Sequence, residues 1–170
     1  IVGSGPAGMA FNPGTALSDE WRKHFFVASF PGGAANARIY GFTLDENGAG
    51  FTMGPERTLL RGILTVGMKI GPDGALYLTD FISGFNSNNN GRLWRLDTPA
   101  TAGSAARKEV QALLLESFAD RPSTGVAPLV QHIDMRIRQK AQFDLVRRRD
   151  VGALLAAAKQ TTHPLARLHG

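Results

Sequence analysis

The sequence predicts antiparallel, all-β propeller blades that form an incomplete ring, followed by an α-helical solenoid. Three observations predict this. Short β-branched and aromatic runs alternate with Gly, Pro and Asn up to residue 97, these runs recur in units of three or four, and the apolar spacing becomes helical from residue 105. We therefore assign residues 1–97 to the C-terminal blades of a propeller, 98–104 to a linker and 105–170 to helical repeats that continue past residue 170.

The first unit of strands is complete. The runs at 24–30 and 37–44 have strand composition, Asn47-Gly48 is a hairpin turn signal, and the run at 58–60 can form the strand that follows. Four-stranded antiparallel units at this spacing are typical of propeller blades, and about four to eight blades close a ring. The chain supplies one full blade and most of a second.

A short motif links the two units. Gly5-Pro6-Ala7-Gly8 recurs as Gly71-Pro72-Asp73-Gly74, and each copy leads to a further apolar run. Proline presets one turn dihedral and the second glycine tolerates positive φ, so we predict that each copy makes a tight connection between two strands. The runs at 75–81 and 91–96 then provide further strands of the second unit.

The small-residue stretch 98–104 has no periodic apolar face and is predicted to be the linker. After it, apolar residues follow a helical spacing, and a short second helix is expected around 126–130. Asp134 is placed to cap a third helix and Asp150 a fourth that runs through Lys159. The apolar positions of these helices are Val110, Leu113, Leu114, Phe118, Ile137, Ala141, Leu145 and, less regularly spaced, Phe143. The segment 163–168 resembles 134–139 and pairs Arg167 with Arg138, which predicts a repeat.

Composition limits the function. The chain has 170 residues, of which 43% are apolar and 19% charged, as in globular proteins. It has no cysteine, which excludes disulfides, thiolate metal sites, a cysteine nucleophile and covalent haem attachment. An apolar run of about 18 residues and a charged leader are both absent, so we expect neither a membrane span nor a signal peptide in this segment.

The net charge of +5 lies in the tail. Residues 1–97 contain eight Lys/Arg and eight Asp/Glu, whereas 98–170 contain eleven and six. No aromatic residues are interleaved as a base-stacking platform among the basic residues of the tail, so we expect a solvated repeat face and no nucleic-acid partner. These basic residues are Arg136, Arg138, Lys140, Arg147, Arg148 and Arg149.

Nearly the whole chain, taken in order, resembles one family. The segments that carry the resemblance are 5–17, 21–30, 39–44, 71–81 (G-P-D-G-A-L-Y-L-T-D-F), 91–96 (G-R-L-W-R-L), 129–138 and 141–143. Together they resemble membrane-bound dehydrogenases of the planctomycete type, in which a glucose/sorbosone dehydrogenase-like β-propeller precedes HEAT repeats and often a cytochrome c domain. The tail resembles the HEAT portion.

The resemblance implies oxidation of a sugar, polyol or related alcohol, with pyrroloquinoline quinone (PQQ), calcium and haem c as cofactors of the family. It also implies a periplasmic or extracellular location and a protein partner for the HEAT-like tail. Sugar dehydrogenases of this fold begin the inner strand of the last blade with two arginines one residue apart, whereas this chain reads Gly62-Ile63-Leu64-Thr65-Val66. No cofactor site, no metal site and no catalytic residue is identifiable in this segment.

Propeller active sites usually lie where the loops between second and third strands meet the starts of the innermost strands. By that analogy the candidate substrate-binding residues are Asn36, Arg38, Arg61, Asp80, Asn86 and Arg92. Guanidinium, amide and carboxylate groups there can orient a polyol. Asp80 can equally close the end of its strand with a structural hydrogen bond, and the asparagines at 86–90 are also typical turn formers.

Other signals favour structural roles. His24 has no catalytic partner at a readable spacing and is predicted to be a packed or capping residue. Residues 3–8 imitate a dinucleotide fingerprint, but Pro6 and Asn12-Pro13-Gly14 prevent the helix that such a site needs. We therefore expect a fragment of a quinoprotein-type sugar or alcohol dehydrogenase, inactive alone because its ring is open; the alternative is a non-catalytic protein-binding scaffold.

Overall fold

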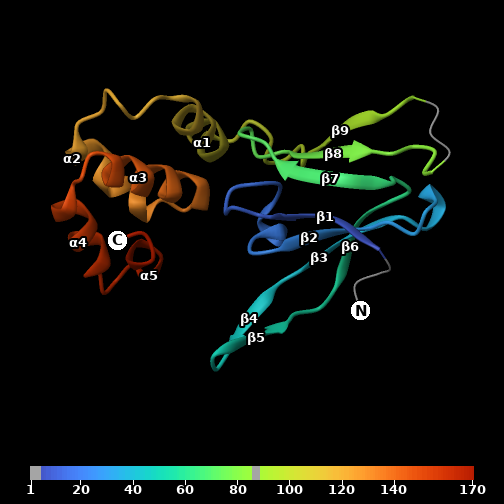
Figure 1. Ribbon diagram of the computed structural model, residues 1–170, viewed down its shortest axis with the longest axis horizontal. Helices are drawn as coiled ribbons and strands as arrows, with labels where there is room; N and C mark the ends of the chain where they lie inside the picture. Colours follow the sequence, from blue (N-terminus) through green and yellow to red (C-terminus); the bar gives the residue numbers. More distant parts are fainter. Residues whose placement is uncertain (1–4, 86–88) are drawn as a thin grey trace. The chain divides into compact units, whose positions relative to one another are not determined.

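The computed structural model describes residues 5–85 and 89–170 (Figure 1). The chain divides into two compact units, Ile1–Ser104 and Ala105–Gly170. We call them the sheet unit and the helical unit.

The sheet unit contains three open antiparallel sheets (Figure 1). The first has the order β1 (Pro6–Phe11), β2 (Phe25–Ser29), β3 (Arg38–Phe42), β6 (Arg57–Arg61). The second is the hairpin of β4 (Leu44–Asn47) and β5 (Gly50–Met53), and the third has the order β7 (Thr65–Ile70), β8 (Leu76–Asp80), β9 (Arg92–Leu96). Two single turns of 3-10 helix, η1 (Asp19–Trp21) and η2 (Ala34–Asn36), lie in the connections. These sheets are compatible with incomplete propeller blades.

The first and third sheets pack together through apolar faces. Because side chains alternate along a strand, Phe26 and Ala28 of β2 point to the same side as Ile39 of β3. Leu76 and Leu78 of β8 supply the facing layer, and all five are almost completely buried in one core cluster. This core fixes the two sheets with respect to each other within the unit.

The innermost strands, β1 and β7, approach closely because both carry glycine at the crossing point. A Cβ atom added to Gly8 would lie 3.2 Å from the Cα of Gly67. The β2–β3 and β8–β9 loops also meet, because a Cβ on Gly84 would lie 2.6 Å from the Gly32 carbonyl oxygen, so the two strands begin at the same end of the unit. The same end therefore holds the loops that join β2 to β3 and β8 to β9.

The structure corrects two expectations about the strands. The fourth strand of the first unit, β6, forms as expected after the turn at Asn47-Gly48 and pairs directly with β3. The chain between these two strands forms β4 and β5, which make a separate two-stranded sheet. Only the second Gly-Pro motif is a turn between strands, with Gly74 at φ 77°. The first copy lies within β1, where Gly8 pairs with Ala28 in the ladder. The connection after β1 begins instead at Asn12, whose side chain holds the backbone of Gly14, Ala16 and Trp21.

The predicted linker is folded onto the sheet unit. Residues 99–103 form turns, and the Thr101 hydroxyl donates to the Leu17 carbonyl at 2.5 Å. The Thr98 amide donates to the Asp97 carboxylate at 2.8 Å, which begins the turn. Threonine and aspartate side chains compete well for local backbone groups, so a small-residue stretch becomes ordered here.

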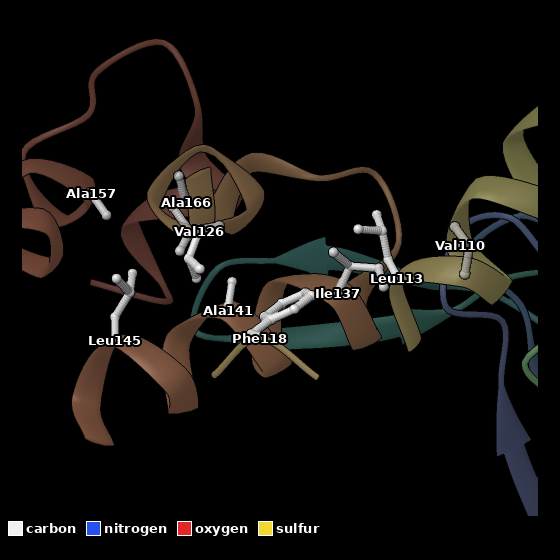
Figure 2. Close-up of a cluster of buried hydrophobic side chains, with 10 residues drawn as sticks. Val110, Leu113, Phe118, Val126, Ile137, Ala141, Leu145, Ala157 and Ala166 are labelled. Carbon is white, nitrogen blue, oxygen red and sulfur yellow. The ribbon is translucent and has the colours of Figure 1, made fainter. Parts of the chain in front are cut away.

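The helical unit consists of α1 (Ala105–Leu115), α2 (Ser123–Val126), η3 (Ala127–Gln131), α3 (Met135–Arg147), α4 (Val151–Ala158) and α5 (Pro164–Arg167). Its core gathers side chains from every one of these elements (Figure 2). The predicted core positions Val110, Leu113 and Phe118 are buried, as are Ile137, Ala141 and Leu145. Phe143 is wrong as a core position, because it is 67% exposed on the other side of α3.

Two predicted helix caps are confirmed. The Asp134 carboxylate accepts from the Arg136 amide at the start of α3, and the Asp150 carboxylate accepts from the Ala153 amide at the start of α4. The expected repeat has less support, since Arg138 is buried whereas Arg167 is exposed. A HEAT-like solenoid therefore stays a prediction. No helix among the described residues is long and apolar enough to cross a membrane.

Candidate functional site

We call the end of the sheet unit at which β1 and β7 begin the loop end. The strand register places Arg38, Arg61, Asp80 and Arg92 there, and Asn36 lies in the β2–β3 loop at the same end, exposed to solvent. Asn86 lies outside the described residues. The five described candidates therefore share one end, and four of them form two separate pairs.

The first pair is Arg38 and Arg61, which are directly opposite in the β3–β6 ladder. Directly opposed residues share one face of a sheet, with Cα atoms about 4.5–5.5 Å apart. The same row continues to Ser29 of β2, on the face of the first sheet that does not pack on β8. Within residues 5–85 and 89–170, neither guanidinium has a hydrogen bond or an ion pair.

The second pair is Asp80 and Arg92, opposite in the β8–β9 ladder. Both carboxylate oxygens of Asp80 accept hydrogen bonds, from the Ile82 amide at 2.9 Å and from Trp94 Nε1 at 3.0 Å. The guanidinium carbon of Arg92 lies 5.8 Å from the centre of the Trp94 ring. Asp80 thus closes the end of its strand with structural hydrogen bonds, which is one of the two roles predicted for it. Each carboxylate oxygen keeps a second lone pair that can accept from another donor, such as a substrate hydroxyl.

A buried hydroxyl lies beside this pair. Thr65, the first residue of β7, is the cross-strand partner of Asp80 and is 1% exposed. Its Oγ1 has no hydrogen-bond partner among the residues that the structure describes. Buried polar groups are nearly always hydrogen-bonded, so an enclosed hydroxyl of this kind marks a place for an internal water molecule.

Three phenylalanines join the two loops of the loop end. Phe30 follows β2, and its ring centre lies 6.1 Å from that of Phe81 and 5.7 Å from that of Phe85. The loops also touch through their backbones, because a Cβ on Gly84 would lie 2.6 Å from the Gly32 carbonyl oxygen. Phe85 is 84% exposed, so an aromatic surface is available beside the polar pairs. No local sequence pattern identifies these rings as part of the site.

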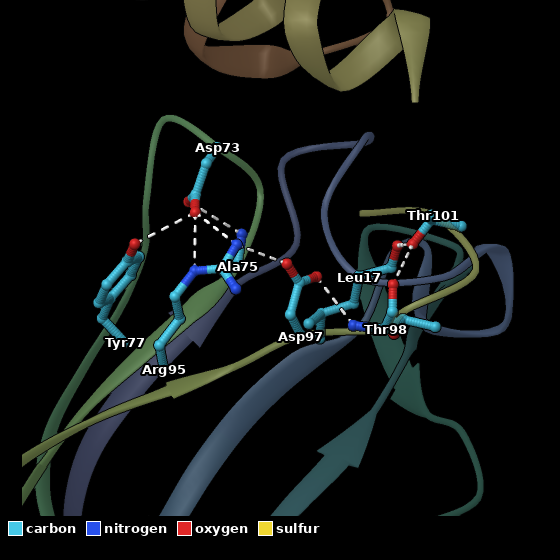
Figure 3. A network of polar contacts seen from close by, with 8 residues as sticks. All are labelled: Leu17, Asp73, Ala75, Tyr77, Arg95, Asp97, Thr98 and Thr101. Carbon is cyan, nitrogen blue, oxygen red and sulfur yellow. Dashed lines mark hydrogen bonds and ion pairs between the residues drawn. The ribbon is translucent and has the colours of Figure 1, made fainter. Parts of the chain in front are cut away.

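The opposite end of the sheet unit is occupied by a structural network. Asp73, in the β7–β8 turn, accepts from the Ala75 amide, the Tyr77 hydroxyl and both Nε and Nη2 of Arg95 (Figure 3). Burial acts to raise the pKa of Asp73, but the hydrogen bonds from Arg95, Ala75 and Tyr77 outweigh it and lower that pKa. The segment 71–74 therefore forms a structural turn, as its sequence suggests. Asp73 in this turn also binds Arg95 of β9, a partner that the sequence did not reveal.

His24 also has a structural role. It is 8% exposed, its Nδ1 lies 2.9 Å from the Arg22 carbonyl oxygen, and its ring meets the edge of Trp21. The prediction of a packed histidine is confirmed.

Several basic residues of the helical unit are structural, which corrects the expected solvated face. Lys140 donates to the carbonyl groups of Leu113 and Leu114 at the end of α1, and burial lowers its pKa. Arg148 donates to the Asp144 carboxylate and the Arg121 carbonyl. Helix ends leave carbonyl groups without partners, and long cationic side chains satisfy them here.

The cofactors implied by the family resemblance do not match the residues present. At the start of β7, Leu64 and Thr65 are buried and carry no cationic group, so the arginine pair for a quinone is not supplied there. Among the described residues no group of three or more His, Asp or Glu could hold a metal ion. The chemistry available at the loop end is therefore ligand binding through guanidinium, carboxylate, hydroxyl and aromatic groups.

Two solved structures are similar to part of this chain. The sequence matches no protein-family model and no curated protein. A solved structure named glucose dehydrogenase is similar at 26% identity over 55% of this chain and 25% of its own, with a TM-score of 0.40. A second, titled crystal structure of glucose dehydrogenase, has 27% identity over 57% of this chain and 24% of its own, with a TM-score of 0.41. The chain therefore spans about a quarter of the length of these structures.

Proposed function

We propose that the chain is a piece of a sugar or alcohol dehydrogenase of the quinoprotein type, in which the sheet unit provides scaffold and substrate contacts at the loop end. The observation that carries this proposal is that the strand register gathers Arg38, Arg61, Asp80 and Arg92 at one end of the two sheets. Asn36 joins them from the β2–β3 loop.

The side chains at the loop end suit a polyhydroxylated ligand. Hydroxyl groups both donate and accept, so they pair with guanidinium donors and with the free lone pairs of the Asp80 carboxylate. Exposed aromatic rings such as Phe85 can cover the apolar face of a sugar ring.

The proposal assigns no redox step to this chain. In the parent protein PQQ would accept the electrons, calcium would assist its binding and haem c would carry the electrons onward, in the periplasm or outside the cell. The described residues of this chain form no site for these groups, so the role proposed here is positioning of the substrate. We expect the 170-residue chain alone to have no turnover.

The experiment is a binding titration of the 170-residue chain by isothermal calorimetry, with glucose, sorbitol and a small alcohol as probes. Saturable binding of a sugar or polyol is expected, and Arg92→Gln should weaken it. Arg57→Gln is the matched control, because Arg57 is an exposed arginine of the same unit that lies at the other end, paired with Glu20. Absence of saturable binding to every probe, or equal weakening by both variants, would overturn the proposal.

A second experiment addresses the parent protein. Full-length protein supplied with quinone and calcium should reduce a dye when sugar is added, and the Arg92→Gln form should show a raised KM. Dye reduction by the 170-residue chain alone would contradict the assignment of chemistry to other parts of the protein.

One observation favours the alternative, a non-catalytic scaffold in which the helical unit binds a protein. A groove of about 310 Å³ lies between η3 and α4, lined mainly by apolar atoms of residues such as Val130 and Ala157. Under this alternative, the full-length protein shows no dye reduction across a broad panel of sugars and alcohols. Removal of the helical unit, residues 105–170, abolishes partner binding.

A further inference from the structure

The ladder between β3 and β6 ends in an arrangement that is unfavourable in the free protein. Arg38 and Arg61 are directly opposite, so two positive charges share one face at the end of one strand pair. Like charges in this position destabilise a sheet. No carboxylate among the described residues compensates them, although most other arginines of the sheet unit have one: Arg22, Arg57 and Arg95 are each ion-paired.

Charge is separated along the strands of the sheet unit. Residues 1–97 have as many acidic as basic side chains, yet the strand register leaves only Asp80 among the acids at the loop end. The other acids lie in the β4–β5 hairpin or at the opposite end, where Asp19, Glu20, Asp73 and Asp97 are ion-paired. The loop end thus holds Arg38, Arg61 and Arg92 against one carboxylate, which gives it a net positive field.

The surroundings of the arginine pair define the shape of a ligand. On the same face, the next rows of the first sheet carry Met9, Val27 and Tyr40 and then Phe11, Phe25 and Phe42, which are apolar or aromatic. The rings of Phe25 and Phe42 stack with centres 5.8 Å apart. In a closed ring a neighbouring blade would cover these apolar rows, so a ligand that fits carries an anionic group at its leading end and reaches the guanidinium pair from the loop end.

We propose that Arg38 and Arg61 form an oxyanion site, which gives the ligand of the loop end an acidic group, as in a sugar acid or a sugar phosphate. The inference rests on the proposed function, and it deepens that function by replacing a neutral sugar with an anionic one. Two guanidinium groups on adjacent strands can each donate to one oxygen of a carboxylate or phosphate, and charge-assisted hydrogen bonds of this kind are the strong ones. Binding removes the repulsion between the two arginines.

The test compares glucuronate with glucose, which differ mainly in one carboxylate, by calorimetric titration of the 170-residue chain. Glucuronate should bind at least about tenfold more tightly, and Arg38→Gln and Arg61→Gln should each weaken glucuronate by about tenfold and glucose by clearly less, because glucose loses only a neutral hydrogen bond. Raising the ionic strength from about 0.01 M to 0.15 M shortens the Debye length from about 30 Å to 8 Å and should weaken glucuronate but not glucose. Arg57→Gln is the control for loss of one positive charge elsewhere in the unit.

A charge reversal provides a second variant that keeps the sheet folded. Arg61→Glu places a carboxylate opposite Arg38, so an internal ion pair should occupy the site and glucuronate binding should be lost. Glucose 6-phosphate tests phosphate as the source of the anionic group, and inorganic phosphate tests binding of an adventitious ion only. Binding of inorganic phosphate as tight as that of either sugar anion would overturn the assignment of a sugar ligand to this pair.

The outcomes separate the inference from the proposed function. Equal binding of glucose and glucuronate, unaffected by Arg38→Gln, contradicts the oxyanion site and leaves the proposed sugar contact in place. If glucose, glucuronate and glucose 6-phosphate all fail to bind, both the oxyanion site and the proposed sugar contact are contradicted. Tight glucuronate binding that persists in Arg61→Glu would place the anion elsewhere and refute the assignment to this pair.

Discussion

Arg38 of β3 and Arg61 of β6 are cross-strand partners at the end of their ladder, and neither is ion-paired among the residues described. Two like charges without a compensating carboxylate lower the stability of the sheet at this position. Such conflicts concentrate at functional sites, where a ligand resolves them. The stability of the sheet unit should therefore respond to these arginines differently from its response to arginines that are paired.

We expect Arg61→Gln to stabilise the ligand-free sheet unit by about 0.5 kcal/mol, because it removes the repulsion across the ladder. Arg57→Gln, in the same strand, should have the opposite effect, since Arg57 pairs with Glu20 and lies over the Trp21 ring. Thermal unfolding followed by circular dichroism at low ionic strength measures both changes. A fall in melting temperature for Arg61→Gln would show that its guanidinium has a structural role instead.

Asp73 should contribute to acid stability. Its pKa is lowered in the folded chain from an ordinary value of 3.8, so its contribution is complete above about pH 4 and is lost as the pH falls through the lowered pKa. Asp73→Asn should cost about 1–2 kcal/mol at pH 7, because the hydrogen bonds to Arg95 and Tyr77 lose their charge. Denaturant unfolding at pH 7 and pH 3 measures this, and the difference between variant and parent should shrink at the lower pH. Asp45→Asn in the exposed hairpin is the control.

His169 should make the helical unit sensitive to mild acid. Its Nε2 lies 3.3 Å from Arg138 Nε and its Nδ1 lies 2.8 Å from Gln142 Oε1, so the ring accepts from Arg138 and donates to Gln142 when it is neutral. Burial, and secondarily the charge of Arg138, lower the pKa of His169 from 6.5.

A histidine with a lowered pKa in the folded state contributes stability that is full above about pH 6.5 and declines as the pH falls toward the folded pKa. Urea unfolding between pH 7.5 and pH 5 should show this decline (both pH values are about one unit or more from the ordinary pKa). His169→Gln should flatten the pH dependence, whereas His163→Gln, at an exposed position, should not. An unchanged profile for His169→Gln would refute the assignment.

The two faces of α3 should differ sharply in their tolerance of substitution. Ile137 is completely buried in the core of the helical unit, so Ile137→Ala should cost about 2–5 kcal/mol through lost burial and a residual cavity. Phe143→Ala should change stability by about 0.5 kcal/mol or less, since that ring is mainly exposed. Denaturant midpoints of the two variants measure the contrast, and a large cost for Phe143→Ala would indicate that a partner or neighbouring unit covers it.

Local patterns in the sequence predicted the elements well. The capping residues Asp134 and Asp150 are readable because a cap acts on an amide two or three residues away. Strands β2, β3, β6, β8 and β9 are readable because alternation and turn residues are also local, whereas the Gly-Pro motif in β1 was interpreted as a turn. Phe143 was assigned to the wrong face because its position fits the apolar stripe of α3 only loosely, and the core settles around Ile137, Ala141 and Leu145.

Relationships across the sheet were less predictable. The pairing of Arg38 with Arg61 depends on how the chain between them folds, and the β4–β5 hairpin occupies that interval as a sheet of its own. The link between Asp73 and Arg95 joins residues on a turn and on a later strand, so no local pattern reveals it. The loop-end candidates could be selected from topology alone, but their division into two pairs required the register.

A sugar or sugar acid that contacts the sheet unit at its loop end should change the environment of the backbone amides there. The most direct measurement is a nuclear magnetic resonance titration of the ¹⁵N-labelled 170-residue chain with glucuronate and, separately, glucose. We expect amide shifts that saturate and are confined to the loop end, around residues 36–38, 61–65, 80–85 and 89–92, with the β4–β5 hairpin and the helical unit unchanged. Saturating shifts located elsewhere, or none with either sugar, would contradict the proposed sugar contact.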